Sequence, residues 1–271
     1  MATPIPQTLN KALDLLARVI EDDGARPLGD LARDLGLPAS TAHRFSRALE
    51  EHGLLTRERP GRYLAGPALL KLAHRLDAGR ILARLARPEL RRLAKRTRQT
   101  VHMGVLEGGM VTYLAKEGGG HAAAFTREDM QLEAYCSGIG KVLLAHLAGE
   151  ERARYLADGP FVALTSQTIV DPAALAIHLD IVRAQAWAID DAEVFEALKC
   201  LAAPVKRPDG LVVAAVSVSA PAEDFDEPYR LRTLEALRET TAAIEARLRS
   251  PRAGSSDDPC GPPRDAPADA A

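Results

Sequence analysis

The spacing of apolar residues changes near Thr100, and this change divides the chain into two differently built parts. Before Thr100, apolar residues recur at steps of three and four residues, which is the period of amphipathic helices. After it come alternating, β-branched runs such as TVHMGVL, which are typical of strands. The 271 residues are enough for two domains of ordinary size, so we expect an α+β chain with one domain in each part.

Residues 1–66 predict a winged helix-turn-helix domain. Helical periods cover 9–20, 27–35 and 40–52, with Ser40 as the expected N-cap of the third helix. Two short segments around Arg59-Pro60-Gly61 then predict a β-hairpin, which takes the place of the wing.

The third predicted helix has one apolar face and one face suited to DNA. At about 100° per residue, Ala42, Phe45 and Leu49 fall on the same side. The opposite side carries polar and arginine side chains near the helix start, where a recognition helix meets base edges. Arginines of the hairpin would contact phosphate or the minor groove. The predicted DNA-contacting residues are Ser40, Thr41, His43, Arg44, Arg47, Arg57, Arg59 and Arg62. A small helical domain that binds another protein fits the same pattern.

Residues 67–98 predict linker helices, with Pro88 marking a kink or a restart. Residues 67–99 carry ten basic and two acidic groups, whereas residues 100–249 carry 14 basic and 22 acidic groups. This contrast indicates either an anionic partner near the junction or a solvated, arginine-rich helix face.

Residues 99–249 predict a second domain with an antiparallel sheet. The sequence predicts a hairpin at Gly108-Gly109, helices over 137–147, 172–187 and 227–249, and strands at WAIDD, CLAAPV and LVVAAVSVS. The turn at 207–210 makes the last two strands antiparallel neighbours. Residues 250–271 are rich in Pro, Asp, Ser and Ala and predict a disordered tail.

The sequence argues against several other classes of protein. No apolar run approaches the roughly 20 residues of a membrane span, and the N-terminus lacks signal-peptide features. The three cysteines lie far apart, which disfavours disulfide and zinc frameworks and fits a reducing cytoplasm. We expect no metal, cofactor or catalysis, because P-loop, G-x-S-x-G and histidine metal-ligand spacings are absent. A nucleophile–base pair of Cys136 with His102 or His121 would need the fold to bring the two side chains together.

Ordered fragments of the chain resemble IclR-type transcriptional regulators. LNKALDLLARV, LGDLARDLGLPASTAHRFSRALEEHGLLTRE and RYLAGPALLKL resemble the N-terminal domain of that family. SGIGKVLLAHL, TIVDPAAL and CLAAPVKRPDGLVVAAVSVSAPAEDF resemble its later segments, so the resemblance covers about residues 8–249. It implies a winged helix, a linker helix and a GAF-like α/β effector-binding domain. It also implies homodimers or homotetramers that bind palindromic operators on double-stranded DNA and respond to small metabolites.

A small-molecule pocket is expected in the second domain. Alternation in LVVAAVSVS places Ser217 and Ser219 on the same face of a strand, beside the strand that begins at Cys200. The helix start in Ser137-Gly138-Ile139-Gly140-Lys141 has free N–H groups that can hold a carboxylate. The resemblance puts the effector pocket between these elements, with Asp191, Cys200, Ser217 and Ser219 at the matching positions. Surface serines and a core cysteine are the alternative interpretation.

We therefore expect an IclR-type regulator of transcription, with a small organic acid as effector and an aromatic carboxylate as one candidate. The second hypothesis is a non-enzymatic, small-molecule-binding adaptor that contacts protein rather than DNA. Binding to DNA from its own upstream region would distinguish the two.

Overall fold

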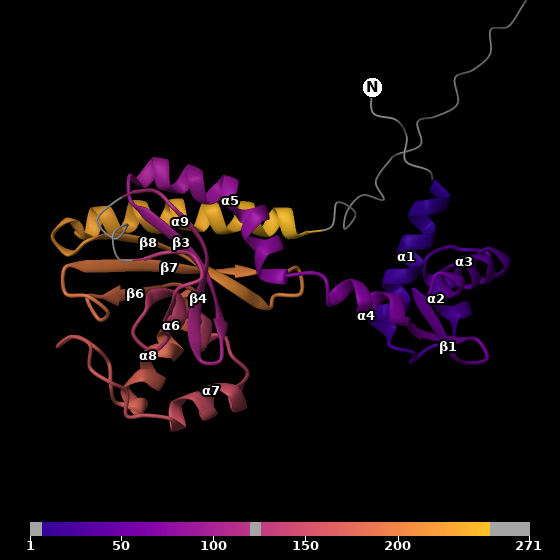
Figure 1. Cartoon of the computed structure of the whole chain (residues 1–271), viewed down its shortest axis with the longest axis horizontal. Coiled ribbons are helices and arrows are strands. Elements are labelled where there is room, and N and C mark those ends of the chain that lie inside the picture. Colours follow the sequence, from indigo (N-terminus) through magenta and orange to yellow (C-terminus); the bar gives the residue numbers. More distant parts are fainter. Residues whose placement is uncertain (1–6, 120–125, 250–271) are drawn as a thin grey trace, which may run out of the picture. The chain divides into compact units, whose positions relative to one another are not determined.

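The computed structural model describes residues 7–119 and 126–249 and divides the chain into two compact units, Met1–Ala78 and Gly79–Ala271 (Figure 1). This division differs from the expected boundaries, because the first linker helix belongs to the first unit and the second packs within the second unit. The predicted tail at 250–271 lies outside the described residues.

The described part of the first unit contains helices around a short hairpin. In chain order its elements are α1 (Gln7–Asp22), α2 (Leu28–Asp34), α3 (Ala39–Glu51), β1 (Leu55–Arg59), β2 (Arg62–Ala65) and α4 (Pro67–Ala73). The two strands are antiparallel, with Leu55 opposite Ala65. The predicted winged helix-turn-helix is therefore confirmed.

The start of α3 differs from the prediction in one detail. Its N-cap is Pro38 rather than Ser40, and no side chain caps the helix. Pro38 has a φ of −58° and a ψ of 140°, so its rigid ring sets the turn from extended chain into helix. Ser40 consequently lies in the first turn of α3, where it is exposed.

Only part of the apolar surface of α1 is buried within the first unit. Leu15 and Val19 are fully buried and pack in one cluster with Leu31 and Phe45. Leu9 and Leu13 are about half exposed, at 53% and 49%. An apolar face of α1 therefore stays uncovered by the described residues of a single chain.

The second unit is built on an antiparallel sheet, whose described strands run in the order β5-β4-β3-β8-β7-β6. The strands are β3 (Thr100–Glu107), β4 (Met110–Glu117), β5 (Gln131–Glu133), β6 (Ala188–Asp191), β7 (Leu198–Lys206) and β8 (Val212–Pro221). The hairpin of β3 with β4 and the antiparallel pairing of β7 with β8 are as predicted. The sequence did not predict β5, because three residues are too few to show a period.

Helices cover both faces of this sheet (Figure 1). On one face lie α5 (Ala78–Thr97) and α9 (Glu227–Leu248), and on the other α6 (Gly138–Ala145), α7 (Gly149–Ala157) and α8 (Pro172–Gln185). Strand β8 alternates between them, since Val216 and Val218 pack toward α5 and α9 while Ser217 and Ser219 face α6. The α+β class is confirmed, and α7 is a helix that the sequence did not predict.

Helix α5 continues through Pro88 without a restart. Proline removes a single helical hydrogen bond, which would run to the carbonyl of Arg84. Ala86 and Leu90, on either side of Pro88, are both fully buried in the core of the second unit. This packing holds the two halves of α5 in one helix, so the expected restart does not occur.

Candidate ligand pocket and nucleic-acid interface

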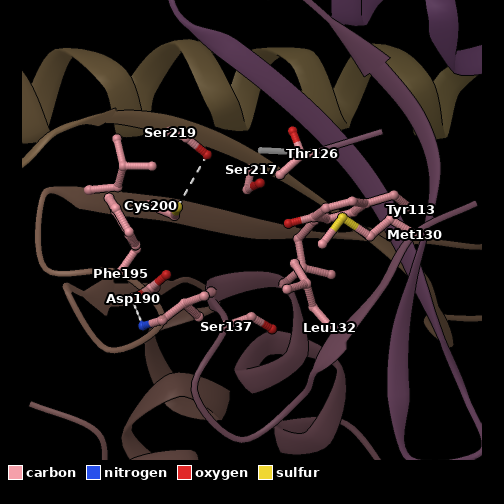
Figure 2. Close-up of a pocket in the computed structure, with 14 residues that line it drawn as sticks. Tyr113, Thr126, Met130, Leu132, Ser137, Asp190, Phe195, Cys200, Ser217 and Ser219 are labelled. Atoms are coloured by element: carbon pink, nitrogen blue, oxygen red, sulfur yellow. Dashed lines mark hydrogen bonds between the residues drawn. The ribbon is translucent and has the colours of Figure 1, made fainter. Parts of the chain in front are cut away.

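A cavity of about 170 Å³ lies between the start of α6 and strands β7 and β8 (Figure 2). Six of the predicted effector residues line it, namely Ser137, Gly138, Ile139, Cys200, Ser217 and Ser219. An engineered apolar cavity of about 150 Å³ holds one benzene ring, so this one has room for a ligand of about that size.

The start of α6 supplies hydrogen-bond donors to the cavity. Ser137 is the N-cap, and its hydroxyl accepts a hydrogen bond from the N–H of Gly140 at 3.1 Å. Gly138 and Ile139 are the first residues of the helix, and N–H groups at these positions have no acceptor within a helix. Both residues are buried at the cavity wall, where these N–H groups and the helix dipole favour an anionic group.

Gly140 has a structural role rather than a place in the cavity wall. A Cβ atom on Gly140 would lie 2.2 Å from the carbonyl oxygen of Ala134, which is closer than real Cβ atoms come. Only glycine lets α6 start against the preceding segment. Gly140 is not among the residues that line the cavity, where the sequence had placed it.

Lys141 is also outside the cavity wall. Its ammonium group is fully buried and donates to the carboxylate of Glu193. Glu193 lies in the turn after β6, and its backbone carbonyl accepts from the hydroxyl of Thr168 at 2.7 Å. The ion pair therefore connects α6 to the turn after β6, and Lys141 does not line the cavity, where the sequence had placed it.

Asp190, rather than the predicted Asp191, lines the cavity. The two residues point to opposite faces of β6, because side chains alternate along a strand. Asp190 is buried and lies opposite Cys200 in the register, whereas Asp191 is exposed and pairs with Lys199 at 2.6 Å. Burial raises the pKa of the Asp190 carboxyl to about 6, although it accepts two backbone hydrogen bonds.

The strand residues of the pocket form a polar row. The Cys200 sulfur lies 3.1 Å from the Ser219 hydroxyl (Figure 2), and Ser217 faces the same cavity. Burial raises the pKa of the Cys200 thiol, so it acts as a neutral group. Both serines are buried, which rules out the alternative of surface serines.

Apolar side chains make up much of the remaining wall, and the sequence did not identify them. Figure 2 shows Tyr113, Met130 and Leu132 on one side of the pocket and Phe195 on the opposite side. These and the other wall residues come from segments without a recognisable motif. The residues missed by sequence reasoning are Tyr113, Thr126, Met130, Leu132, Asp190, Val194, Phe195 and Leu198.

Cys136 and His102 do not form the possible nucleophile–base pair. The His102 ring bonds to the hydroxyl of Thr126 at 2.8 Å, and burial lowers its pKa to about 3. The Cys136 sulfur contacts the carbonyl of Glu133, and burial raises the pKa of this thiol to about 12. His121 lies outside the described residues. Neither Cys136 nor Cys200 therefore has the thiolate character of a nucleophile.

Within 7–119 and 126–249, His, Cys, Asp and Glu side chains form no group of three or more that could hold a metal ion. None of the helices in the same ranges has the length and apolar character needed to cross a membrane.

The outer face of α3 presents the predicted DNA-contacting side chains. Ser40, His43, Arg44 and Arg47 are exposed, and Thr41 is half-buried. On the opposite side, Ala42, Phe45 and Leu49 are buried as predicted. The Nε of Arg47 lies 3.2 Å from a carboxylate oxygen of Glu51, but both side chains are exposed and such pairs are weak.

The hairpin arginines differ from one another. Arg57 and Arg59 are exposed on β1. Arg62 is half-buried, and its guanidinium donates to the carbonyl oxygens of Gly24, at 2.8 Å, and Ala25. The guanidinium of Arg62 therefore already holds the turn between α1 and α2, and a contact with DNA would compete with these hydrogen bonds.

The excess of basic residues in α5 is largely neutralised within the second unit. Four of its arginines form ion pairs with glutamates. Arg87 pairs with Glu117 and Glu128, and Arg91 also pairs with Glu117. Arg92 pairs with Glu89 and Arg96 with Glu239. These pairs favour an arginine-rich helix face over a separate anionic partner at the junction.

Two family models match the chain. The IclR helix-turn-helix domain matches residues 8–59, and the bacterial transcriptional regulator IclR C-terminal domain matches residues 74–246. The second match alone covers more than half of the chain, and the first coincides with the helices and hairpin that present the candidate DNA contacts.

Known regulators and solved structures resemble the chain over most of its length. The HTH-type transcriptional regulator XynR of Escherichia coli K12 is 30% identical over 250 residues, which are 92% of this chain and 99% of XynR. BhcR of Paracoccus denitrificans is 32% identical over 217 residues, or 79% of this chain and 77% of BhcR. An IclR homolog from Microbacterium hydrocarbonoxydans, crystallised with 4-hydroxybenzoate, matches with a TM-score of 0.59 at 29% identity. That match covers 89% of this chain and 98% of the homolog.

Proposed function

Because the chain belongs to the IclR family of DNA-binding transcriptional regulators, we propose that a small organic acid in the α6–β8 cavity controls its binding to operator DNA. The family's DNA-binding and effector-binding domains are both present. The relatives are regulators rather than enzymes, and we propose the same for this chain, acting on DNA in the cytoplasm.

One observation carries the effector assignment. The cavity has hydrogen-bonding groups at two opposed walls, the α6 start and the polar row of β7 and β8, with apolar side chains around them. A carboxylate at the α6 start would receive N–H groups and about half a positive charge from the helix. The apolar wall suits a small hydrocarbon or aromatic body, and the relative from Microbacterium hydrocarbonoxydans was crystallised with an aromatic acid.

A thermal melt tests the effector assignment. A carboxylate at about 100 times its Kd should stabilise the folded protein by about 2.7 kcal/mol, which raises the melting temperature. The double variant Ser217→Ala, Ser219→Ala should lose this shift, while Asp191→Asn, outside the cavity, should keep it. A full shift in the double variant would mean that the acid binds elsewhere.

For DNA, we propose that α3 enters the major groove and the β1–β2 hairpin contacts the backbone. The proposed contacts are Ser40, Thr41, His43, Arg44, Arg47, Arg57 and Arg59, all of which carry donors or acceptors on α3 or the hairpin. Selection from random duplexes should enrich a palindromic sequence. Recovery of no preferred sequence would favour the adaptor hypothesis, in which the first unit binds protein.

We propose that the chain assembles at least as a homodimer, because a palindromic site requires a symmetric protein. The expected contact is an apolar stripe of the linker segment, formed by Leu69, Leu72 and Leu76. Leu69 is half-buried, and the exposure of the other two side chains supports the contact. Leu72 and Leu76 are 52% and 60% exposed, and the neighbouring Leu70 is 66% exposed. Exposed leucines on α4 and in the segment that follows it suit an isologous contact with a second copy.

A further inference from the structure

We propose that the effector's carboxylate enters the cavity together with one proton taken up from solution, and that Asp190 holds this proton against the ligand. The inference rests on the proposed function, because it concerns the acid assigned to the same cavity. It makes Asp190 the group that couples binding of the acid to the uptake of a proton.

Asp190 is built into the cavity wall with only 3% of its surface exposed. One carboxylate oxygen accepts the N–H of Glu193 at 2.8 Å and that of Val194 at 3.3 Å. These two bonds fix the carboxyl group at the turn after β6. Its register partner Cys200 brings a neutral thiol to the same place.

Beside the Asp190 carboxylate, the cavity has no unpaired cation that could balance the carboxylate of a ligand. Lys141 approaches from α6, but its ammonium is already matched by Glu193 in a fully buried pair. The other titratable neighbours are the thiols of Cys136 and Cys200 and the Tyr113 hydroxyl, and burial raises the pKa of all three. No lysine or arginine lines the cavity among residues 7–119 and 126–249.

An ionised ligand would therefore place two carboxylates in one cavity. Two such groups at one site raise the pKa of one of them strongly, because like charges cannot both ionise at low cost. The α6 start offsets only about half a charge. A proton shared between Asp190 and the ligand removes the repulsion and adds a charge-assisted O–H···O hydrogen bond.

The size of the proton uptake follows from the ionisation of the free partners. Burial raises the pKa of Asp190 to about 6, so at pH 7.5 nearly all free protein carries this group ionised. Simple carboxylic acids are also ionised at that pH. Binding should then take up close to one proton, and the association constant should fall by up to about tenfold per pH unit between pH 7 and 8.

Calorimetry on the full chain measures this uptake directly. Benzoate, 4-hydroxybenzoate and propionate are titrated at pH 7.5 in MOPS and in Tris, whose ionisation enthalpies differ. The expected difference in binding enthalpy corresponds to between about half and one proton per bound acid. A smaller difference for an acid that binds overturns the inference and leaves the proposed function intact. If none of the acids binds, even at pH 5.5, the proposed effector class fails with it.

Two aspartate variants identify the group. Asp190→Asn keeps an oxygen for the two backbone N–H groups but cannot take up a proton, so its binding should lose the buffer dependence. The matched control Asp191→Asn changes the exposed neighbour and should keep it. Retained uptake in Asp190→Asn would show that another group takes the proton. If that variant does not fold, the unaltered protein is titrated with 4-hydroxybenzamide instead. This neutral analogue should bind without proton uptake.

Discussion

Two arginines of the first unit differ in what their guanidinium groups contact. Arg62 donates to the carbonyl oxygens of Gly24 and Ala25, which form part of the turn between α1 and α2. Arg44 is exposed on α3 and has no ion-pair partner within the part of the chain that the structure describes. Both were predicted to contact DNA, and we propose that Arg44 contacts a base whereas Arg62 holds the turn between α1 and α2.

Arg44→Ala should cost roughly 1–3 kcal/mol of specific DNA binding if the side chain reads a base. Binding to a random duplex and the melting temperature should change little. Arg62→Ala should instead lower the melting temperature, because it leaves two carbonyl groups without their donor. Fluorescence anisotropy with specific and random duplexes separates the roles. An equal loss on both duplexes would show that Arg44 contacts only phosphate.

The buried ion pair of Lys141 and Glu193 should matter for the stability of the second unit, and removing one partner should cost more than removing both. Lys141→Met leaves a buried carboxylate without its cation and should reduce the free energy of unfolding by about 3–5 kcal/mol. Adding Glu193→Gln should restore part of this loss. The exposed pair is a matched control, since Arg47→Ala should change stability by less than about 1 kcal/mol. Chemical denaturation measures all four proteins, and an unchanged Lys141→Met would contradict the role of the pair.

At the scale of elements, periodicity predicted most helices and strands but only part of the cavity wall. The alternation of β8 correctly placed Ser217 and Ser219 on one face. On β6 a one-residue error exchanged Asp190 for Asp191, because a shift of one residue turns a strand's side chains to the other face. Tyr113 could not be predicted, since its strand β4 reaches the cavity only through β3, which pairs with the distant β8. Phe195 lies in the connection between β6 and β7, where no periodic pattern shows which way a side chain points.

Gly140→Ala tests how α6 docks in the second unit. The added methyl group would overlap the backbone of Ala134, so we expect a loss of at least 1–3 kcal/mol of stability, as for overpacked sites. The ligand-induced rise in melting temperature should shrink as the start of α6 moves. Gly149→Ala is the matched control, because a methyl group at the start of α7 meets no atom within 4 Å. Equal melting temperatures for the two variants would show that the Gly140 contact is unimportant.

At the scale of the whole molecule, the two units carry separate parts of one activity. The first presents the polar face of α3, and the second encloses the cavity. The order of these parts was predicted from the sequence, because each contains motifs of its own. The charge contrast between regions did not reveal a partner, since the arginines of α5 pair with glutamates of the same unit.

Assembly is the prediction that belongs to this scale. Sedimentation at micromolar concentration should show a homodimer or homotetramer, and Leu72→Glu should weaken it because a charge would enter the proposed apolar contact. Leu211→Glu changes a leucine of equal exposure, 53%, in the turn between β7 and β8, and should leave the assembly unchanged. A monomer for the unaltered protein would refute the proposed dimer.

The most direct test of the account follows operator binding while an organic acid is added. Anisotropy of a labelled operator duplex should report binding by both the unaltered protein and the Ser217→Ala, Ser219→Ala variant. The acid should change the affinity of the unaltered protein for the duplex and should leave that of the variant constant. An equal response of both proteins would contradict the assignment of the α6–β8 cavity as the site through which the effector acts.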